Sequence, residues 1–197
     1  MQCSHAVYQP FVMRTIVEIE ISPHGVMLNG ASLAVNSAST DLLHEIYRSQ
    51  VNDYPKFFKM DGLSKLGFLA SELLLKSLNE ERFLLRQDRA VILFGKTGSI
   101  EADRHYQQTI CNPSDYYPSP SVFVYTLPNI VTGEIAIRNH YQGETSFYCV
   151  DKPTDELMKS VIQTLWLDPI TTSVLVGWVE YVDSTRFLAN LKLIVKS

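Results

Sequence analysis

The stretch from Ser119 to Tyr148 reads SPSVFVYTLPNIVTGEIAIRNHYQGETSFY and predicts a helix followed by a short strand. Pro128 suits the start of the helix, because its missing N–H would have no partner in a first turn. Gly133, inside the helix, would let a neighbouring backbone approach closely. Gly143 would end the helix and turn the chain into an extended segment from Thr145 to Cys149. By periodicity alone, the stretch is an ordinary amphipathic helix that leads into a core strand.

Composition and charge bound the kind of protein. The 197 residues suit one domain over 1–197, which would bury about 70% of its unfolded surface. Apolar residues make up 46% and charged residues 19%, the balance of a globular protein. The net charge of −4 provides no basic field, so neither nucleic acid nor a membrane is expected as a partner. No segment is long and apolar enough to predict a membrane span.

The cysteines argue against a disulfide framework and a metal site. Cys3, Cys111 and Cys149 are an odd number with no regular spacing, so paired cysteines and a zinc site are not indicated. The N-terminus lacks the basic region and apolar run of a signal peptide. We therefore expect a cytoplasmic protein without metal or cofactor.

The rest of the chain alternates strand and helix patterns. Strands are predicted at 13–21, 89–94, 145–150, 172–182 and 187–195, and helices at 40–49, 61–78, 101–110, 127–141 and 153–167. The segment 25–39 is expected to form a hairpin arm or loop, and 111–121 a structured loop. Helices between strands imply a mostly parallel or mixed five-stranded sheet between two helical layers, with the terminal hairpin as an antiparallel edge.

Spaced residues in the opening stretch match a known family. They are Asn129, Gly133, Ala136, Ile137 and Gly143, which fall where the β-ketoacyl synthases of the thiolase superfamily carry the same residues. Two further motifs resemble that family: Lys59-Met60-Asp61 before a long helix, and Val174-Leu175-Val176-Gly177 followed by Glu180. The resemblance covers roughly residues 59–182 and implies the N-terminal half of a thiolase-like α/β fold.

The resemblance fails at the residue that carries the family's chemistry. In the ketosynthases this strand leads to a nucleophilic cysteine at a helix N-terminus, where the helix dipole favours a thiolate. Counted from Gly143 without a gap, that position falls on Lys152, which cannot carry an acyl thioester. Cys149 lies three residues earlier, a shift that turns a strand side chain to the opposite face. We expect Cys149 to be a buried structural cysteine and the chain to have no catalytic residue.

For three further features we consider a structural role before a functional one. Asp61 is expected to be the N-cap of the helix that follows, and only secondarily a functional group. Gly95-Lys96-Thr97-Gly98-Ser99 follows an apolar strand, but the phosphate-loop signature needs a glycine where Ala90 stands. His140 is a weak candidate for a general base.

The missing second half suggests a function. In the ketosynthases a second, similar half supplies two histidines, and this sequence ends where that half would begin. A single half would expose an apolar face and should pair with a complete synthase or with itself. The family also forms dimers through the strand before the active site, which implies an interface at Thr145, Ser146, Phe147 and Tyr148.

Three hypotheses follow from these expectations. The first is a catalytically silent ketosynthase-like half protein without independent enzyme activity, which acts with a full-length β-ketoacyl synthase or an acyl carrier protein in fatty-acid or polyketide synthesis. The second is an acyl-transfer enzyme that uses Cys149 with a base from a partner. The third is a non-catalytic module that binds an acyl chain or coenzyme A.

Overall fold

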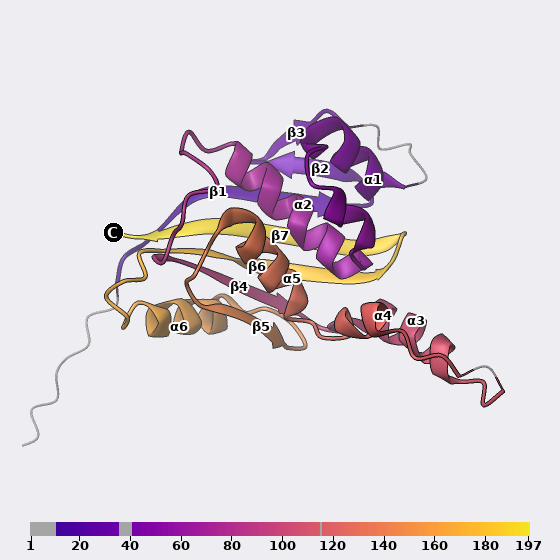
Figure 1. The fold of residues 1–197 in the computed structure, drawn as a ribbon. Helices are drawn as coiled ribbons and strands as arrows, with labels where there is room; N and C mark the ends of the chain where they lie inside the picture. The colour runs from indigo at the N-terminus through magenta and orange to yellow at the C-terminus, as the bar shows by residue number, and fades with distance from the viewer. Residues whose placement is uncertain (1–10, 36–40, 115) are drawn as a thin grey trace, which may run out of the picture.

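The structure, a computed structural model, describes residues 11–35, 41–114 and 116–197 (Figure 1). Cys3, His5 and Thr40 lie outside the described residues. The strands are β1 Met13–Ser22, β2 Gly25–Leu28, β3 Ala31–Leu33, β4 Arg89–Gly95, β5 Thr145–Cys149, β6 Ser173–Asp183 and β7 Arg186–Lys196. The helices are α1 Leu42–Ile46, η1 Tyr47–Val51, η2 Pro55–Lys59, α2 Gly62–Lys76, α3 Ile100–Ile110, α4 Pro120–Val124, α5 Ile130–Asn139 and α6 Asp155–Leu165.

The strands form one mixed sheet in the order β3-β2-β1-β7-β6-β4-β5. β4 is parallel to β5 and β6, whereas the other four pairings are antiparallel. The predicted mixed α/β fold is confirmed, but a mostly parallel sheet and a count of five strands were wrong. The predicted hairpin arm after β1 supplies the two additional strands, β2 and β3, which extend the sheet. The last strand, β7, lies between β1 and β6 rather than at an edge.

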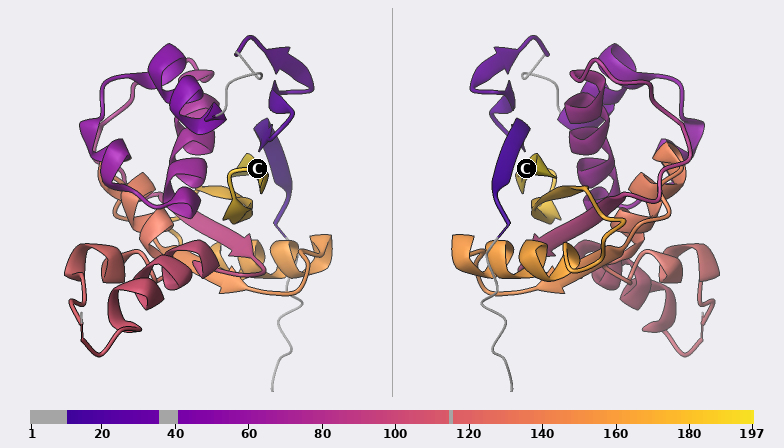
Figure 2. Two further views of the ribbon diagram at one scale, coloured as in Figure 1. Left: turned by 90° about the vertical axis from the view of Figure 1, so that its right-hand side faces the viewer. Right: turned by 90° about the vertical axis from the view of Figure 1, so that its left-hand side faces the viewer.

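Helices cover both faces of the sheet and make three layers. α1, α2 and α5 pack on one face over one apolar core, and α6 packs on the other face over a second core (Figures 1 and 2). β4 supplies both cores, because Val91 and Leu93 face α2 while Ala90, Ile92 and Phe94 face α6. Alternating side chains of one strand point to opposite faces, which explains the uninterrupted apolar run in this segment.

The outer surface of α6 is polar. Its exposed residues are Asp155, Glu156, Lys159, Ser160 and Thr164, and Thr154 caps its first turn by accepting a hydrogen bond from the Leu157 N–H. The broad apolar face expected of a single half is therefore absent from the outer side of this helix. A groove with apolar lining residues lies beside α6 on this side of the sheet.

Helix α5 is shorter than the opening stretch predicts. It begins after Asn129 and ends at Asn139, and His140 follows in a left-handed conformation with φ of 56°. Gly143 therefore does not end the helix. It is required three residues later, because a Cβ on Gly143 would lie 2.3 Å from the carbonyl oxygen of Arg89. A histidine can adopt this conformation, although glycine adopts it more readily.

Two other local predictions need correction. Outside its own helix backbone and chain neighbours, no heavy atom lies within 4 Å of the position that a Cβ on Gly133 would occupy, so this glycine does not serve the close approach of another backbone. The expected loop 111–121 ends in a short helix, α4, whose N-cap Ser119 accepts a hydrogen bond from the Val122 N–H. α3 and α4 pack on each other and form an arm that projects beyond the end of β4 (Figure 1).

Candidate functional site

The carboxyl ends of the three parallel neighbours meet at one edge of the sheet. β4 ends at Gly95, β5 ends at Cys149, and the matching part of β6 precedes Glu180. In open α/β sheets, ligands bind outside the carboxyl ends of such strands. Lys96, Cys149 and Glu180 lie at this end, whereas Gly143 packs against Arg89 at the amino end of β4.

Glu180 holds the turn that follows β4. Its carboxylate accepts hydrogen bonds from the Lys96 N–H at 2.6 Å, from the Thr97 N–H at 3.2 Å and from the Thr97 hydroxyl at 2.5 Å. Lys96 Nζ lies 2.5 Å from Asp151 Oδ1, and this hydrogen-bonded pair raises the pKa of Lys96 and lowers the pKa of Asp151. The glutamate that resembles the family's motif thus has a structural role, and the ion pair connects the turn to the loop before α6.

Cys149 is exposed, so the prediction of a buried cysteine was wrong. Among the described strands, it ends an edge strand that pairs only with β4, and one side of such a strand remains open to solvent. The Sγ atom lies beside Gly98 and Pro128: a Cβ on Gly98 would lie 3.4 Å from Sγ and 3.0 Å from Pro128 Cγ. The thiol is therefore accessible at the carboxyl end of the sheet.

Lys152 lies in an exposed bend between β5 and α6, two residues before the cap Thr154. The first turn of α6 carries Asp155 and Glu156. These carboxylates already complement the positive end of the helix dipole. A lysine beside an acidic first turn offers neither a nucleophile for acyl transfer nor the electropositive setting that a thiolate requires.

Asp61 is the N-cap of α2, as predicted. Its side chain accepts a hydrogen bond of 3.0 Å from the Ser64 N–H. Burial raises the pKa of Asp61 to about 6, and the nearby charge of Glu101 adds to this rise. Gly62 is required beside it, because a Cβ there would lie 2.0 Å from the ring of Tyr181.

A cavity of about 860 Å³ opens next to Asp61. Residues from five segments line it, among them Phe58, Lys59, Glu101, Tyr125 and Tyr181. Its wall is fixed by Glu134, which pairs with Lys56 at 2.7 Å and accepts a hydrogen bond from the Tyr125 hydroxyl at 3.3 Å. Burial raises the pKa of Tyr125, and it raises the pKa of Tyr181 to about 12. Both hydroxyls therefore remain protonated hydrogen-bond donors at neutral pH.

The sequence reasoning missed Glu101, Tyr125 and Tyr181 of this cavity. They come from segments far apart in the chain, and each alone has an ordinary helix or strand context. Only Lys59-Met60-Asp61 was singled out beforehand, and all three of these residues line the cavity. The arrangement can bind a polar ligand, and its lining, among the described residues, contains no cysteine.

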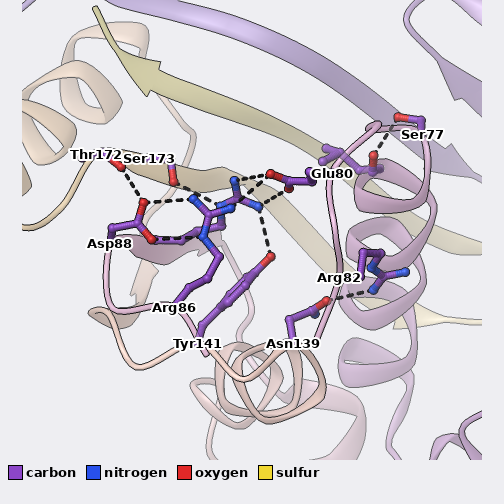
Figure 3. Close-up of polar contacts among 11 residues, drawn as sticks. Ser77, Glu80, Arg82, Arg86, Asp88, Asn139, Tyr141, Thr172 and Ser173 are labelled. Carbon is purple, nitrogen blue, oxygen red and sulfur yellow. Dashed lines mark hydrogen bonds and ion pairs between the residues drawn. The ribbon is translucent and has the colours of Figure 1, made fainter. Parts of the chain in front are cut away.

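A second polar cluster lies at the opposite, amino end of β4 (Figure 3). The buried Arg89 guanidinium donates to Glu80 at 2.6 Å, to the Tyr141 hydroxyl at 3.1 Å and to the Ser173 hydroxyl at 3.1 Å. Beside it, Arg86 donates two hydrogen bonds to Asp88 and holds the pKa of that carboxyl below its usual range. The cluster ties the loop after α2 to the first residues of the parallel strands.

The described part of the chain shows neither a metal cluster nor a membrane-spanning helix. Within 11–35, 41–114 and 116–197, no group of three or more histidine, cysteine or acidic side chains is arranged to hold a metal ion. Across the same ranges no helix has the length and apolar character needed to cross a bilayer.

Comparison with known proteins gives a match in structure only. No protein-family model matches the sequence, and no curated protein matches it significantly. The ishigamide ketosynthase/chain length factor matches with a TM-score of 0.71 at 16% identity, over 94% of this chain. This chain has the ketosynthase fold. A ketosynthase in complex with its chain length factor from Xenorhabdus doucetiae matches with a TM-score of 0.57 at 15% identity, over 96% of this chain.

A third match is a type II polyketide synthase acyl-carrier protein in complex with its ketosynthase, with a TM-score of 0.62, 10% identity and 95% of this chain covered. This chain spans 62% of the ishigamide protein and 59% of the chain matched in the carrier-protein complex. It spans 80% of the chain matched in the Xenorhabdus complex. The fold therefore agrees with the family that the sequence motifs resemble, over a part of the length of the larger proteins.

Proposed function

We propose that this chain is a catalytically silent, single-domain ketosynthase-like half protein that acts beside a full-length ketosynthase in fatty-acid or polyketide synthesis. The observation that carries the proposal is the chemistry at the carboxyl end of β5. The gap-free nucleophile position holds Lys152 before an acidic helix turn. In the described part of the chain, no hydrogen bond joins Cys149 to a histidine that could activate it.

The structural neighbours support a partner role. They include a ketosynthase with its chain length factor and a ketosynthase with an acyl-carrier protein. In the Xenorhabdus complex the match covers 96% of this chain and 80% of the matched chain. An acyl carrier protein is a second proposed partner. The free thiols of Cys111 and Cys149 suit a cytoplasmic setting.

The proposed contact surface is the open side of β5. As the last strand of the sheet in residues 11–35, 41–114 and 116–197, β5 leaves one row of backbone groups without a neighbouring strand. Its sequence TSFYC contains neither the lysine nor the proline that protect many edges. The strand has two aromatic residues, Phe147 and Tyr148, and Tyr148 is 37% exposed. Phe147 instead packs inward, 2.8 Å from the position of a Cβ on Gly95. A strand of the partner synthase, or of a second copy, would extend the sheet here.

A proline at the start of β5 tests this proposal. Val150 N–H bonds to Gly95 on β4, so the alternation of the ladder leaves the N–H of Thr145 on the open side. Proline is tolerated at such a position, because it removes only an outward N–H. Thr145→Pro should abolish co-elution with a ketosynthase from the same cell, whereas Thr145→Val should retain it. If mass spectrometry of complexes recovered from cells finds neither a synthase nor a carrier protein, the proposed function is wrong.

The exposed thiol favours a second candidate, acyl transfer by Cys149 with a base from the partner. A cysteine-directed ketosynthase inhibitor separates the two functions. Under the silent-partner proposal, Cys149 is labelled no faster with the synthase present than Cys111, the other cysteine among the described residues. Selective acceleration at Cys149, lost in Cys149→Ser, would instead assign the enzyme function.

The cavity beside Asp61 favours a third candidate, a module that binds an acyl chain or coenzyme A. A ligand that binds only the folded state raises the melting temperature by mass action. Stabilisation of the isolated chain by acyl-coenzyme A, with no effect from a synthase, would favour this module over the silent partner.

A further inference from the structure

A groove lies beside α6, on the face of the sheet opposite α2. It has a volume of about 570 Å³, within the range of pockets that bind small molecules. Its floor follows β7 from Leu188 to Ile194, a length of about 20 Å at the rise of an extended strand. The volume and the length suit a linear ligand rather than a compact one.

The two walls of the groove differ in polarity. The wall formed by α6 and β6 presents four apolar side chains, Met158, Ile162, Val176 and Trp178, beside the charged Asp155 and Lys159 of α6. Methionine side chains adapt to chains of different shape. The opposite wall, from β7 and β1, carries Asn190, Lys192 and Thr15. A ligand that fits must therefore present an alkyl chain to one wall and a polar group to the other.

The charge of the groove lining determines whether that polar group should be an anion or a cation. Lys159 from α6 and Lys192 from β7 line the groove, against the single carboxylate Asp155 at its Pro153 end. The lining is thus net positive, although the whole chain carries −4. Lys192 forms only a long, exposed pair with Glu18 at 3.4 Å. Among the described residues, Lys159 has no ion-pair partner and Asn190 no side-chain hydrogen bond.

We propose that this groove is a binding site for a linear alkyl chain with one anionic head group, as in a medium-chain carboxylate. The chain lies on Met158, Ile162 and Trp178, and the head group lies between Lys159 and Lys192. The site is separate from the cavity beside Asp61, and the inference does not depend on the proposed function. It gives the chain a ligand that its own residues recognise.

Trp178 provides the test, because the other tryptophan, Trp166, is buried at 1% exposure. Decanoate brominated on its chain, kept below micelle-forming concentrations, should quench the fluorescence of the full chain saturably. Trp178→Phe should remove the quenching. The double variant Lys159→Glu with Lys192→Glu should weaken decanoate binding by roughly fivefold or more, with no change for the uncharged decanol.

Leu188→Glu tests the apolar part of the site. The native Leu188 side chain is 37% exposed, so the fold should tolerate the substitution. This variant should weaken the binding of both decanoate and decanol while the melting temperature stays unchanged. Absence of saturable quenching, quenching that persists in Trp178→Phe, or equal decanoate binding by the double lysine variant would overturn the proposal. A dimer in light scattering that Leu188→Glu dissociates would also overturn it, because a second copy would then occupy the groove.

Discussion

The carboxylate of Glu180 accepts a 2.6 Å hydrogen bond from the backbone N–H of Lys96 and so joins β6 to the turn after β4. The same carboxylate also accepts hydrogen bonds from the N–H and the hydroxyl of Thr97. This contact explains a glutamate three residues after Gly177 without assigning it any chemistry. It also sets the position of the loop that faces Cys149.

Glu180→Gln should lower the free energy of unfolding by about 1 kcal/mol, because the amide lacks the charge and one of the acceptors that the turn uses. Urea denaturation at pH 7 measures the change. Lys96→Gln is the matched control, since the Lys96 side chain reaches only the exposed Asp151, and it should leave stability unchanged. An equal loss in both variants would mean that the turn is held by the Lys96 pair instead.

Asp61 should make stability depend on pH. Its pKa rises from 3.8 to about 6 on folding, chiefly through burial, so the folded state binds the proton more tightly than the unfolded state. This contribution is fully present below about pH 4 and is lost as the pH rises to about 6. Asp61→Asn keeps an N-cap acceptor and should stabilise the protein above pH 6 by roughly 2 kcal/mol. Parallel pH profiles for the two proteins would contradict this prediction.

The two motif glycines should respond oppositely to alanine. Gly133→Ala meets no atom within 4 Å outside its own helix backbone and chain neighbours and should stabilise α5 by about 0.5–1 kcal/mol, the usual difference between the residues in a helix. Gly143→Ala would place a Cβ 2.3 Å from the Arg89 carbonyl oxygen and should cost roughly 1–3 kcal/mol. Thermal unfolding of both variants checks the pair. Destabilisation by Gly133→Ala would show that this position is packed.

Glu72 should be among the costliest side chains to neutralise. It is 2% exposed and pairs with Arg82 at 2.5 Å and Arg138 at 3.3 Å. Glu72→Gln leaves two largely buried guanidinium groups without their shared carboxylate, at a cost of about 3–5 kcal/mol. Asp183→Asn, which breaks the exposed pair with Arg186, is the control and should have a much smaller effect on urea denaturation.

The local sequence pattern predicted the elements whose burial is determined by residues close together in the sequence. The apolar run of β4, the leucine-rich stripe of α2 and the Asp61 cap were all readable, because neighbours in sequence determine them. The sequence did not indicate that Glu72 is the centre of a buried ion-pair cluster, because the two arginines that pair with it lie 10 and 66 residues away.

Strand order and exposure were the parts that sequence could not provide. Whether β7 is central and β5 an edge depends on pairings between distant segments. The exposure of Cys149 follows from that order, so the prediction of burial failed for the same reason. The resemblance to the ketosynthases correctly indicated the fold because its spaced residues span several elements.

The most direct measurement is the mass in solution of this chain mixed with a ketosynthase from the same cell, by light scattering on a size-exclusion column. The silent-partner account predicts a mixed complex that contains both chains. Separate elution of the two proteins, with this chain unchanged in mass, would contradict it.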